Sequence, residues 1–108
     1  MELPKVAVKP AADDAVVVIC SGEFDMDTVG ILAAACERDA ADAELLVLDV
    51  AWVAFADSSF LNELIRLRNT RQMVLAGPLP AQLRRMLEMT GALDLFQVRG
   101  HTTADPAA

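Results

Sequence analysis

The stretch LLVLDVAWVAFADSSFL, residues 45–61, passes from a nearly continuous apolar run into an aspartate and two serines. Its first part, residues 45–53, has the length and composition of a β-strand that is covered on both faces, as in parallel or mixed sheets. From Phe60 onward the apolar residues follow helical spacing instead. Residues 57–59 therefore lie in a strand-to-helix turn, where α/β proteins commonly carry functional residues.

The residues alone leave two interpretations of this turn open. Asp and Ser are preferred N-cap residues, because their side-chain oxygens accept hydrogen bonds from unpaired N–H groups in the first helical turn. A serine at a helix N-terminus also lies near backbone donors and the positive end of the helix dipole, which would hold an added phosphate favourably. The first interpretation is purely structural, and the second makes the turn a phosphorylatable switch.

The regions on either side predict an α/β fold. An edge strand or extended arm is expected within residues 1–14, followed by a strand over 15–21 and a loop over the letters GEFD, residues 22–25. A helix with Asp25 or Asp27 as N-cap should end near Ala40. The helix after the 57–59 turn is amphipathic, and its apolar arc comprises Phe60, Leu61, Leu64, Ile65 and Leu67.

The C-terminal third continues the alternation of strands and helices. A short strand is expected over 73–76, a helix between Pro80 and Gly91, and a last strand over 95–98. We therefore predict a mixed sheet of four to five strands packed with three to four helices. Residues 15–99 form the domain in this scheme, and residues 100–108 form a flexible C-terminal tail.

Composition narrows the classes of function. With 108 residues and 55% hydrophobic residues, the chain predicts a single domain with an ample core. Nine Lys+Arg against sixteen Asp+Glu give a formal charge of −7, which disfavours nucleic acid as a partner. Apolar stretches are far shorter than the ~20 residues of a membrane-spanning helix, and no signal sequence opens the chain. We expect a cytoplasmic protein that does not insert into membranes.

Few residues suit catalysis or metal binding. Cys20 and Cys36 lack CxxC spacing and are expected to be reduced core thiols, and the only histidine, His101, lies in the tail. A serine hydrolase would need a G-x-S-x-G elbow and a histidine in a structured segment, which this sequence lacks. We therefore expect no catalytic residues, no metal site and no cofactor in this chain.

Four motifs in order, carried by three segments, resemble one family. The segments SGEFD (21–25), LLVLDVAWVAFADSSFL (45–61) and VLAGPLPAQLRRMLEMTGALDLF (74–96) are similar to the STAS domain, the fold of bacterial anti-sigma factor antagonists. The resemblance covers about Val16 to Val98. It implies a non-enzymatic regulator of sigma-factor-dependent transcription, with Ser58 as the phosphoacceptor.

The resemblance also implies partners. The unmodified antagonist would bind an anti-sigma factor that is itself a serine/threonine kinase, with ATP and magnesium on the kinase, and phosphorylation would release it. A phosphatase would be a further partner. The expected partner-binding residues are Asp25, Asp57, Ser59, Phe60 and Asn62.

Two of these residues keep a second interpretation. For Asp25 the alternative role is helix capping. Phe60 stands where the family usually has glycine, so its ring must either turn into the core or stand exposed beside Ser58 as a hydrophobic anchor. Arg84 and Arg85 indicate the solvated face of the last helix, with a partner contact as the alternative.

An alternative function follows from two departures from the family pattern. Besides Phe60, the segment after the second helix is about two helical turns shorter than is common in the family. Both departures favour a STAS scaffold that is never phosphorylated and serves as a subunit of another complex, such as a transport assembly. A small enzyme or nucleotide-binding module is a third class, supported by family-level precedent only.

Overall fold

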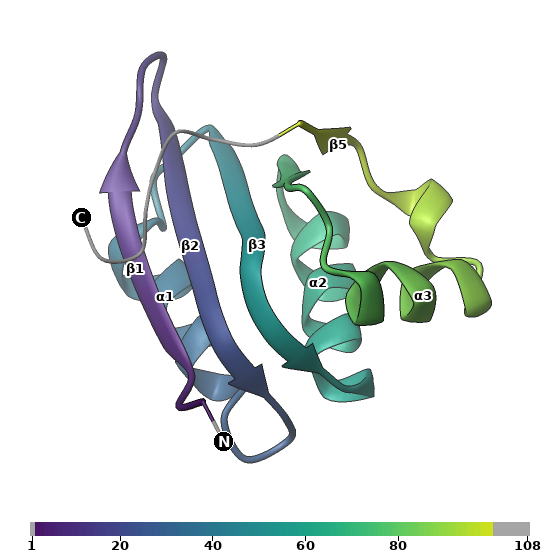
Figure 1. Cartoon of the computed structure of the whole chain (residues 1–108). Helices are drawn as coiled ribbons and strands as arrows, with labels where there is room; N and C mark the ends of the chain where they lie inside the picture. The colour runs from purple at the N-terminus through teal and green to yellow at the C-terminus, as the bar shows by residue number, and fades with distance from the viewer. Residues whose placement is uncertain (1, 101–108) are drawn as a thin grey trace.

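The chain folds into a five-stranded sheet with helices packed against it, as a computed structural model that describes residues 2–100 shows (Figure 1). His101 and all but the first residue of the expected C-terminal tail lie outside the described residues. The elements follow one another in the order β1 (Lys5–Pro10), β2 (Ala15–Phe24), α1 (Gly30–Asp39), β3 (Leu45–Ala56), α2 (Ser58–Thr70), β4 (Met73–Ala76), α3 (Ala81–Met89), the 3₁₀-helix η1 (Leu93–Leu95) and β5 (Val98–Arg99).

The strands lie side by side in sequence order. β1 pairs antiparallel with β2, and the pairs β2–β3, β3–β4 and β4–β5 are parallel. The β1–β2 turn places Asp13 and Asp14 at φ of 60° and 58°, a left-handed conformation that aspartate tolerates better than most residues. The mixed α/β architecture predicted from the sequence is confirmed, and its parallel strands bring the ends of β2 and β3 to one edge of the sheet.

Several element boundaries differ from those predicted. β2 runs on to Phe24, so three of the four residues of the expected GEFD loop belong to the strand and only Asp25 follows it. The last strand is not at 95–98, because a 3₁₀ turn occupies Leu93–Leu95 and β5 covers only Val98–Arg99. The strand at Met73–Ala76 and the end of α1 at Asp39 agree with the prediction.

β3 carries two irregularities near its end. Its register against β2 shifts between Ile19 and Ser21 and again between Gly22 and Glu23. At the first shift the Asp49 carboxylate accepts a hydrogen bond from the Ala51 N–H at 3.0 Å. Such extra residues bend a strand and re-aim its side chains. Beyond the first shift β3 exposes Trp52 and Phe55, although it is a central strand.

The core lies between the sheet and the helices. Fully buried side chains from β2, β3, β4 and all three α-helices form one cluster, which includes Val18, Leu32, Leu48, Leu64, Leu75 and Leu83. The thiols of Cys20 and Cys36 are free and buried there. Burial raises the pKa of Cys36 to about 11 and raises that of Cys20 further. None of the helices within residues 2–100 is long and apolar enough to cross a bilayer.

The far end of α2 is tied to α1. Arg71, which caps the C-terminus of α2, donates hydrogen bonds from its guanidinium to the carbonyl oxygens of Cys36, Ala40 and Ala43 at 3.4, 2.5 and 3.2 Å. These carbonyls belong to the last turn of α1 and the loop after it. One charged side chain therefore fixes the two helix ends together.

Candidate functional site

The turn between β3 and α2 is held by Asp57. Its backbone is extended, and its carboxylate Oδ1 accepts hydrogen bonds from the N–H groups of Ser59 and Phe60 at 2.8 and 3.4 Å. These are two of the donors that a helix start leaves without backbone partners. The capping role considered for the turn therefore falls to Asp57, and neither serine is needed for it.

Ser58 is the first residue of α2 and is exposed. Its hydroxyl makes no hydrogen bond within the described part of the chain. Asn62, one helical turn further along, is exposed on the same side of α2, whereas Ser59 is half-buried. The first turn of α2 thus presents a hydroxyl that contributes nothing to capping.

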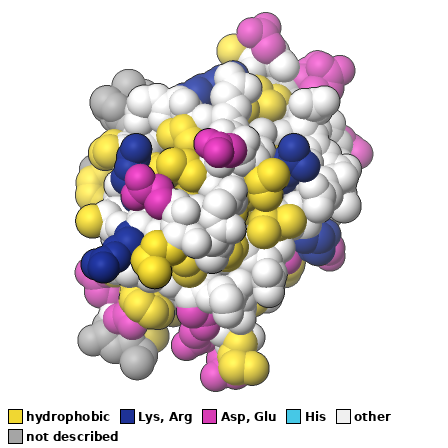
Figure 2. All heavy atoms as spheres, turned by 90° about the vertical axis from the view of Figure 1, so that its right-hand side faces the viewer, with side chains coloured by type: hydrophobic (Ala, Val, Ile, Leu, Met, Phe, Trp, Pro, Cys, Tyr) yellow, Lys and Arg dark blue, Asp and Glu magenta, His cyan; other side chains and the backbone are white. Residues whose placement is uncertain are grey.

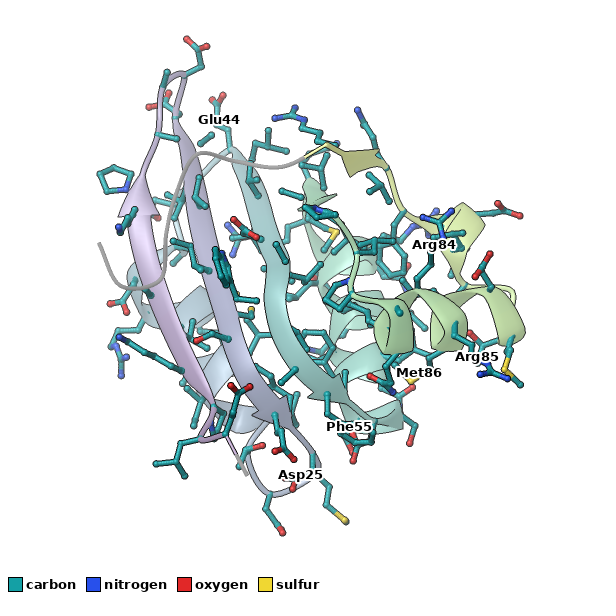
Figure 3. The ribbon with its side chains drawn as sticks, in the orientation of Figure 1. Asp25, Glu44, Phe55, Arg84, Arg85 and Met86 are labelled. Atoms are coloured by element: carbon teal, nitrogen blue, oxygen red, sulfur yellow. The ribbon has the colours of Figure 1, made fainter. Side chains whose placement is uncertain are left out.

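The end of β2 lies directly beside this turn. The Asp57 N–H donates a hydrogen bond to the carbonyl of Phe24 at 3.2 Å, so Asp25 follows immediately after the contact. Figure 3 shows Asp25 at the same end of the sheet as Phe55, and Glu44 at the opposite end. The fold therefore brings Asp25 and residues 57–59 together, although more than thirty residues separate them in the sequence.

Asp25 organises its own loop. Its Oδ1 accepts hydrogen bonds from the N–H groups of Asp27 and Thr28 at 2.9 and 3.1 Å, and from the Thr28 hydroxyl at 3.0 Å. The Thr28 hydroxyl oxygen in turn accepts the Asp25 N–H at 2.9 Å. This reciprocal pair closes the turn at residues 25–28. The N-cap of α1 is Val29, which has no side-chain cap hydrogen bond, so the prediction that Asp25 or Asp27 caps this helix is wrong.

Phe60 differs from the other expected partner-binding residues. Its side chain is fully buried, and its ring centroid lies 5.0 Å from that of Phe24. Of the two orientations that the sequence left open, the structure has the core one. A fully buried ring offers no surface to a partner, so the expected direct contact is corrected for this residue: Phe60 supports the turn from beneath.

A side chain from α3 also holds the turn, and sequence analysis did not identify it. The Gln82 amide accepts a hydrogen bond from the Ala56 N–H at 2.9 Å and donates one to the Ala56 carbonyl at 2.7 Å. Ala56 is the last residue of β3 and directly precedes Asp57. Because the partners are 26 residues apart, no local pattern signals this contact.

Exposed apolar side chains surround the turn. Met26, in the Asp25 loop, is 77% exposed, and Phe55 is 44% exposed two residues before Asp57. Large apolar side chains on a soluble surface mark contact sites when they gather in one place. The single residues Met26 and Phe55 carried no signal in the sequence, because their grouping depends on the meeting of the β2 and β3 ends.

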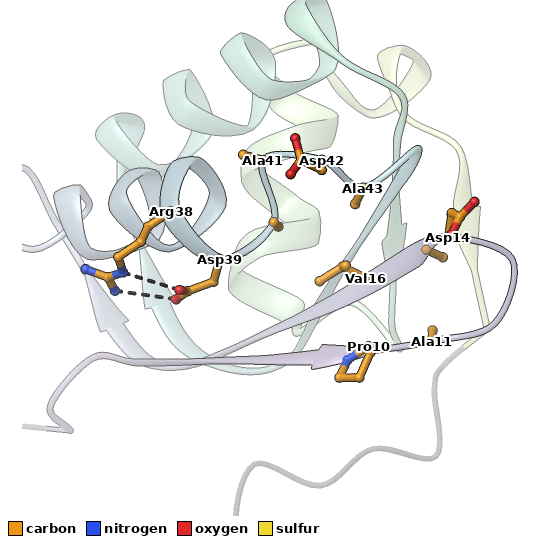
Figure 4. Close-up of a pocket in the computed structure, with 11 residues that line it drawn as sticks. Pro10, Ala11, Asp14, Val16, Arg38, Asp39, Ala41, Asp42 and Ala43 are labelled. Atoms are coloured by element: carbon orange, nitrogen blue, oxygen red, sulfur yellow. Dashed lines mark hydrogen bonds and ion pairs between the residues drawn. The ribbon is translucent and has the colours of Figure 1, made fainter.

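A hollow of about 340 Å³ lies elsewhere, between the β1–β2 turn and the end of α1 (Figure 4). Residues at the start of β2 and in the loop that leads into β3 line it, so it is at the opposite end of these strands from Ser58. Its one basic side chain, Arg38, pairs with Asp39 at 3.3 Å. Within residues 2–100 no group of three or more His, Cys, Asp or Glu side chains is placed to hold a metal ion.

The sequence profile of the STAS domain matches residues 6–105. The chain belongs to the STAS domain family. No match was found among curated proteins. The mixed sheet, its helices and the turn at residues 57–59 are therefore those of a STAS domain.

Solved structures of anti-sigma factor antagonists share this fold. This STAS domain resembles the crystal structure of an anti-sigma factor antagonist from Mycobacterium paratuberculosis with a TM-score of 0.82 and 26% identity, over 97% of this chain and 92% of the other. It also shares the fold of the anti-sigma factor antagonist SpoIIAA in its unphosphorylated form, with a TM-score of 0.69 and 17% identity over 89% of each chain. The phosphorylated form of SpoIIAA, a Bacillus cell fate determinant, gives a TM-score of 0.62 and 16% identity over 89% of this chain and 92% of that one.

Proposed function

We propose that this STAS domain is an anti-sigma factor antagonist, and that phosphorylation of Ser58 switches off its binding to an anti-sigma factor. The observation that carries the proposal is that neighbouring residues at the start of α2 have different roles. Asp57 caps the helix and Phe60 packs into the core, while Ser58 between them is exposed. A kinase can therefore modify the Ser58 hydroxyl without breaking a hydrogen bond or a core contact.

The partner in this proposal is an anti-sigma factor that acts as a serine/threonine kinase and supplies ATP and magnesium itself. A phosphatase would restore the free hydroxyl. The chain would act in the cytoplasm by binding alone, with no catalytic residue of its own, and would regulate transcription by freeing a sigma factor. The 26% identity to an anti-sigma factor antagonist over nearly the whole chain supports this role.

The charge of the site explains how a phosphate would weaken binding. Asp25, Asp27 and Asp57 already lie at this end of the sheet in a chain of formal charge −7. A phosphate on Ser58 adds about −1.5 to −2 charges and must lose water when a partner covers it. A loss of only ~1.4 kcal/mol lowers affinity tenfold. Asp25, Ser59 and Asn62 would border the contact, with Asp57 shaping the turn.

The alternative of a scaffold that is never phosphorylated loses one of its two supports. It rested on Phe60 and on the short segment after the second helix. Because Phe60 is buried beneath the turn, it does not obstruct the approach of a kinase to Ser58. Only the short segment still favours the scaffold.

The test is phosphorylation followed by a binding measurement. The chain is incubated with ATP, magnesium and the candidate anti-sigma kinases of the same genome, and its intact mass is measured beside Ser58→Ala and Ser59→Ala. We expect one added phosphate on the wild type and on Ser59→Ala, and none on Ser58→Ala. Ser58→Asp should bind the same kinase at least about tenfold more weakly. Absence of phosphate on the wild type with every kinase, together with unchanged affinity of Ser58→Asp, contradicts the proposal.

A further inference from the structure

The outer face of α3 carries a shallow groove that the functions discussed so far do not use. Its lining residues share one helical stripe at spacing i, i+3, i+4, i+7 and i+8, and the groove measures about 310 Å³. The stripe consists of Gln82, Arg85, Met86, Met89 and Thr90. The core-facing side of the helix, with Leu83 and Leu87, is separate from it.

The groove begins at the Ser58 turn. Gln82, its first residue, holds Ala56 with the two hydrogen bonds described above, and Ala56 is two residues from Ser58. Figure 3 shows Met86 and Arg85 on the side of α3 toward Phe55, whereas Arg84 is on the other side of the helix. The stripe therefore continues the exposed surface around Phe55 and Ser58 along α3.

The stripe combines a cation with adaptable apolar side chains. Arg85 is exposed and makes no ion pair or hydrogen bond within residues 2–100, whereas Arg84 has Glu88 at 3.9 Å. Met89 is 77% exposed, and Met86 is half-buried next to it on the stripe. Figure 2 shows hydrophobic patches next to basic side chains on the face of the molecule that carries α3. Methionine is flexible and polarizable, and is frequent at surfaces that bind other chains.

Charge decides what this stripe would bind. An arginine guanidinium pairs with a carboxylate in a planar, two-bond geometry, and an acidic partner is otherwise repelled by a chain of formal charge −7. Arg85 is thus the point next to the Ser58 turn at which an acidic side chain is favoured. Met86 and Met89 on either side of it suit an apolar neighbour.

From these observations we infer that the α3 groove is a second part of the partner surface, and that it takes an acidic and apolar segment of the anti-sigma factor. A carboxylate of the segment pairs with Arg85, and an apolar side chain lies between Met86 and Met89. The inference rests on the proposed function for the identity of the partner. It goes beyond that function because the contact is away from the phosphoacceptor and does not depend on Ser58.

The test uses overlapping peptides of roughly 15 residues that cover the candidate anti-sigma factors, a length that fits one helical or extended docking segment. Binding to the full chain is measured for the wild type, Arg85→Glu and Arg84→Glu. The two variants change the net charge equally from neighbouring positions on opposite sides of α3. We expect acidic, apolar peptides to bind the wild type, and to bind Arg85→Glu at least about fivefold more weakly but Arg84→Glu within about twofold. Met89→Ala should weaken binding as well.

Three results overturn the inference: no acidic peptide binds, basic peptides bind best, or the two arginine variants lose affinity equally. None of these depends on phosphate transfer to Ser58, which the intact-mass experiment measures separately. Peptide binding that needs Arg85, in a chain that no kinase modifies and whose Ser58→Asp variant binds with unchanged affinity, would support the groove and contradict the switch. Phosphorylation of Ser58 with no effect of Arg85→Glu on peptide binding would do the reverse.

Discussion

The rings of Phe24 and Phe60 lie 5.0 Å apart at an interplanar angle of 41°, and both side chains are fully buried. Phe24 ends β2, and Phe60 lies in the first turn of α2. The pair therefore joins the strand that carries Asp25 to the helix that carries Ser58. Tilted aromatic pairs add to stability beyond the apolar area that they bury.

Replacing Phe60 by alanine should strongly destabilise the fold. Removing a buried phenylalanine ring costs about 3–5 kcal/mol, because the cavity that is left collapses only in part. We expect the free energy of unfolding in urea to fall by that amount. Phe55→Ala removes the same ring from a half-exposed position and should cost less than about 1 kcal/mol. Equal losses for the two variants would mean that Phe60 is not in the core.

Loss of the Asp57 cap should have a smaller effect. Asp57→Ala removes the acceptor of the Ser59 and Phe60 N–H groups and should lower the free energy of unfolding by about 1 kcal/mol. Asp57→Asn keeps an oxygen acceptor and should retain most of the stability. The control is Asp27→Ala, since the Asp27 carboxylate makes no hydrogen bond within the described residues. Ser58→Ala should be neutral, and a loss similar to that of Asp57→Ala would show that Ser58 has a structural role.

The Gln82 amide offers a graded test of the link between α3 and β3. Gln82→Leu leaves the N–H and C=O of Ala56 without partners, which should cost about 1–3 kcal/mol. Gln82→Glu can still accept the Ala56 N–H but can no longer donate to the carbonyl, so we expect an intermediate loss at neutral pH. Gln72→Leu is the matched control at an exposed glutamine. Denaturant unfolding of the wild type and the three variants measures these losses. Equal free energies of unfolding for all four proteins would contradict the proposed link.

The buried thiols predict a loss of stability at high pH. Burial raises the pKa of Cys36 from 9.0 to about 11, and that of Cys20 in the same direction. The unfolded chain therefore releases the thiol protons at lower pH than the folded chain. The contribution of the protonated thiols to the free energy of unfolding is fully present below about pH 9 and falls as the pH rises toward 11. Unfolding free energies across this window should fall less steeply for Cys36→Ala than for the wild type. Parallel curves would rule out a contribution from Cys36.

The features that could be predicted from the sequence are those with a local pattern of apolar residues or motifs. Apolar runs and helical spacing located β3, β4 and α2, and the order of four motifs was enough to predict the STAS fold. The predicted apolar arc of α2 includes Phe60, Leu64 and Leu67, and all three are buried. These features depend on nearest neighbours in sequence, which is why they can be read without a structure.

Features that depend on distant partners were missed. The extension of β2 to Phe24 is explained by pairing with the end of β3, and the amide contact of Gln82 joins segments 26 residues apart. Arg85 was interpreted as a solvated residue with a partner contact as the alternative. Its place beside Met86 and Met89 on the outer stripe, and the ion pair that Arg84 makes with Glu88, distinguish the two arginines. Such groupings arise from tertiary packing and produce no periodic pattern in the sequence.

The Arg71 contact bears on how a signal at Ser58 would be read. Three carbonyl oxygens at the end of α1 are bound to one guanidinium at the far end of α2. α2 is therefore anchored at both ends, by Arg71 at one and by Asp57 and Phe60 at the other. A helix held in this way has little freedom to slide or rotate when a phosphate is added at its tip. We expect the free and the phosphorylated chain to have the same backbone conformation. The partner would then distinguish the two states by surface charge alone.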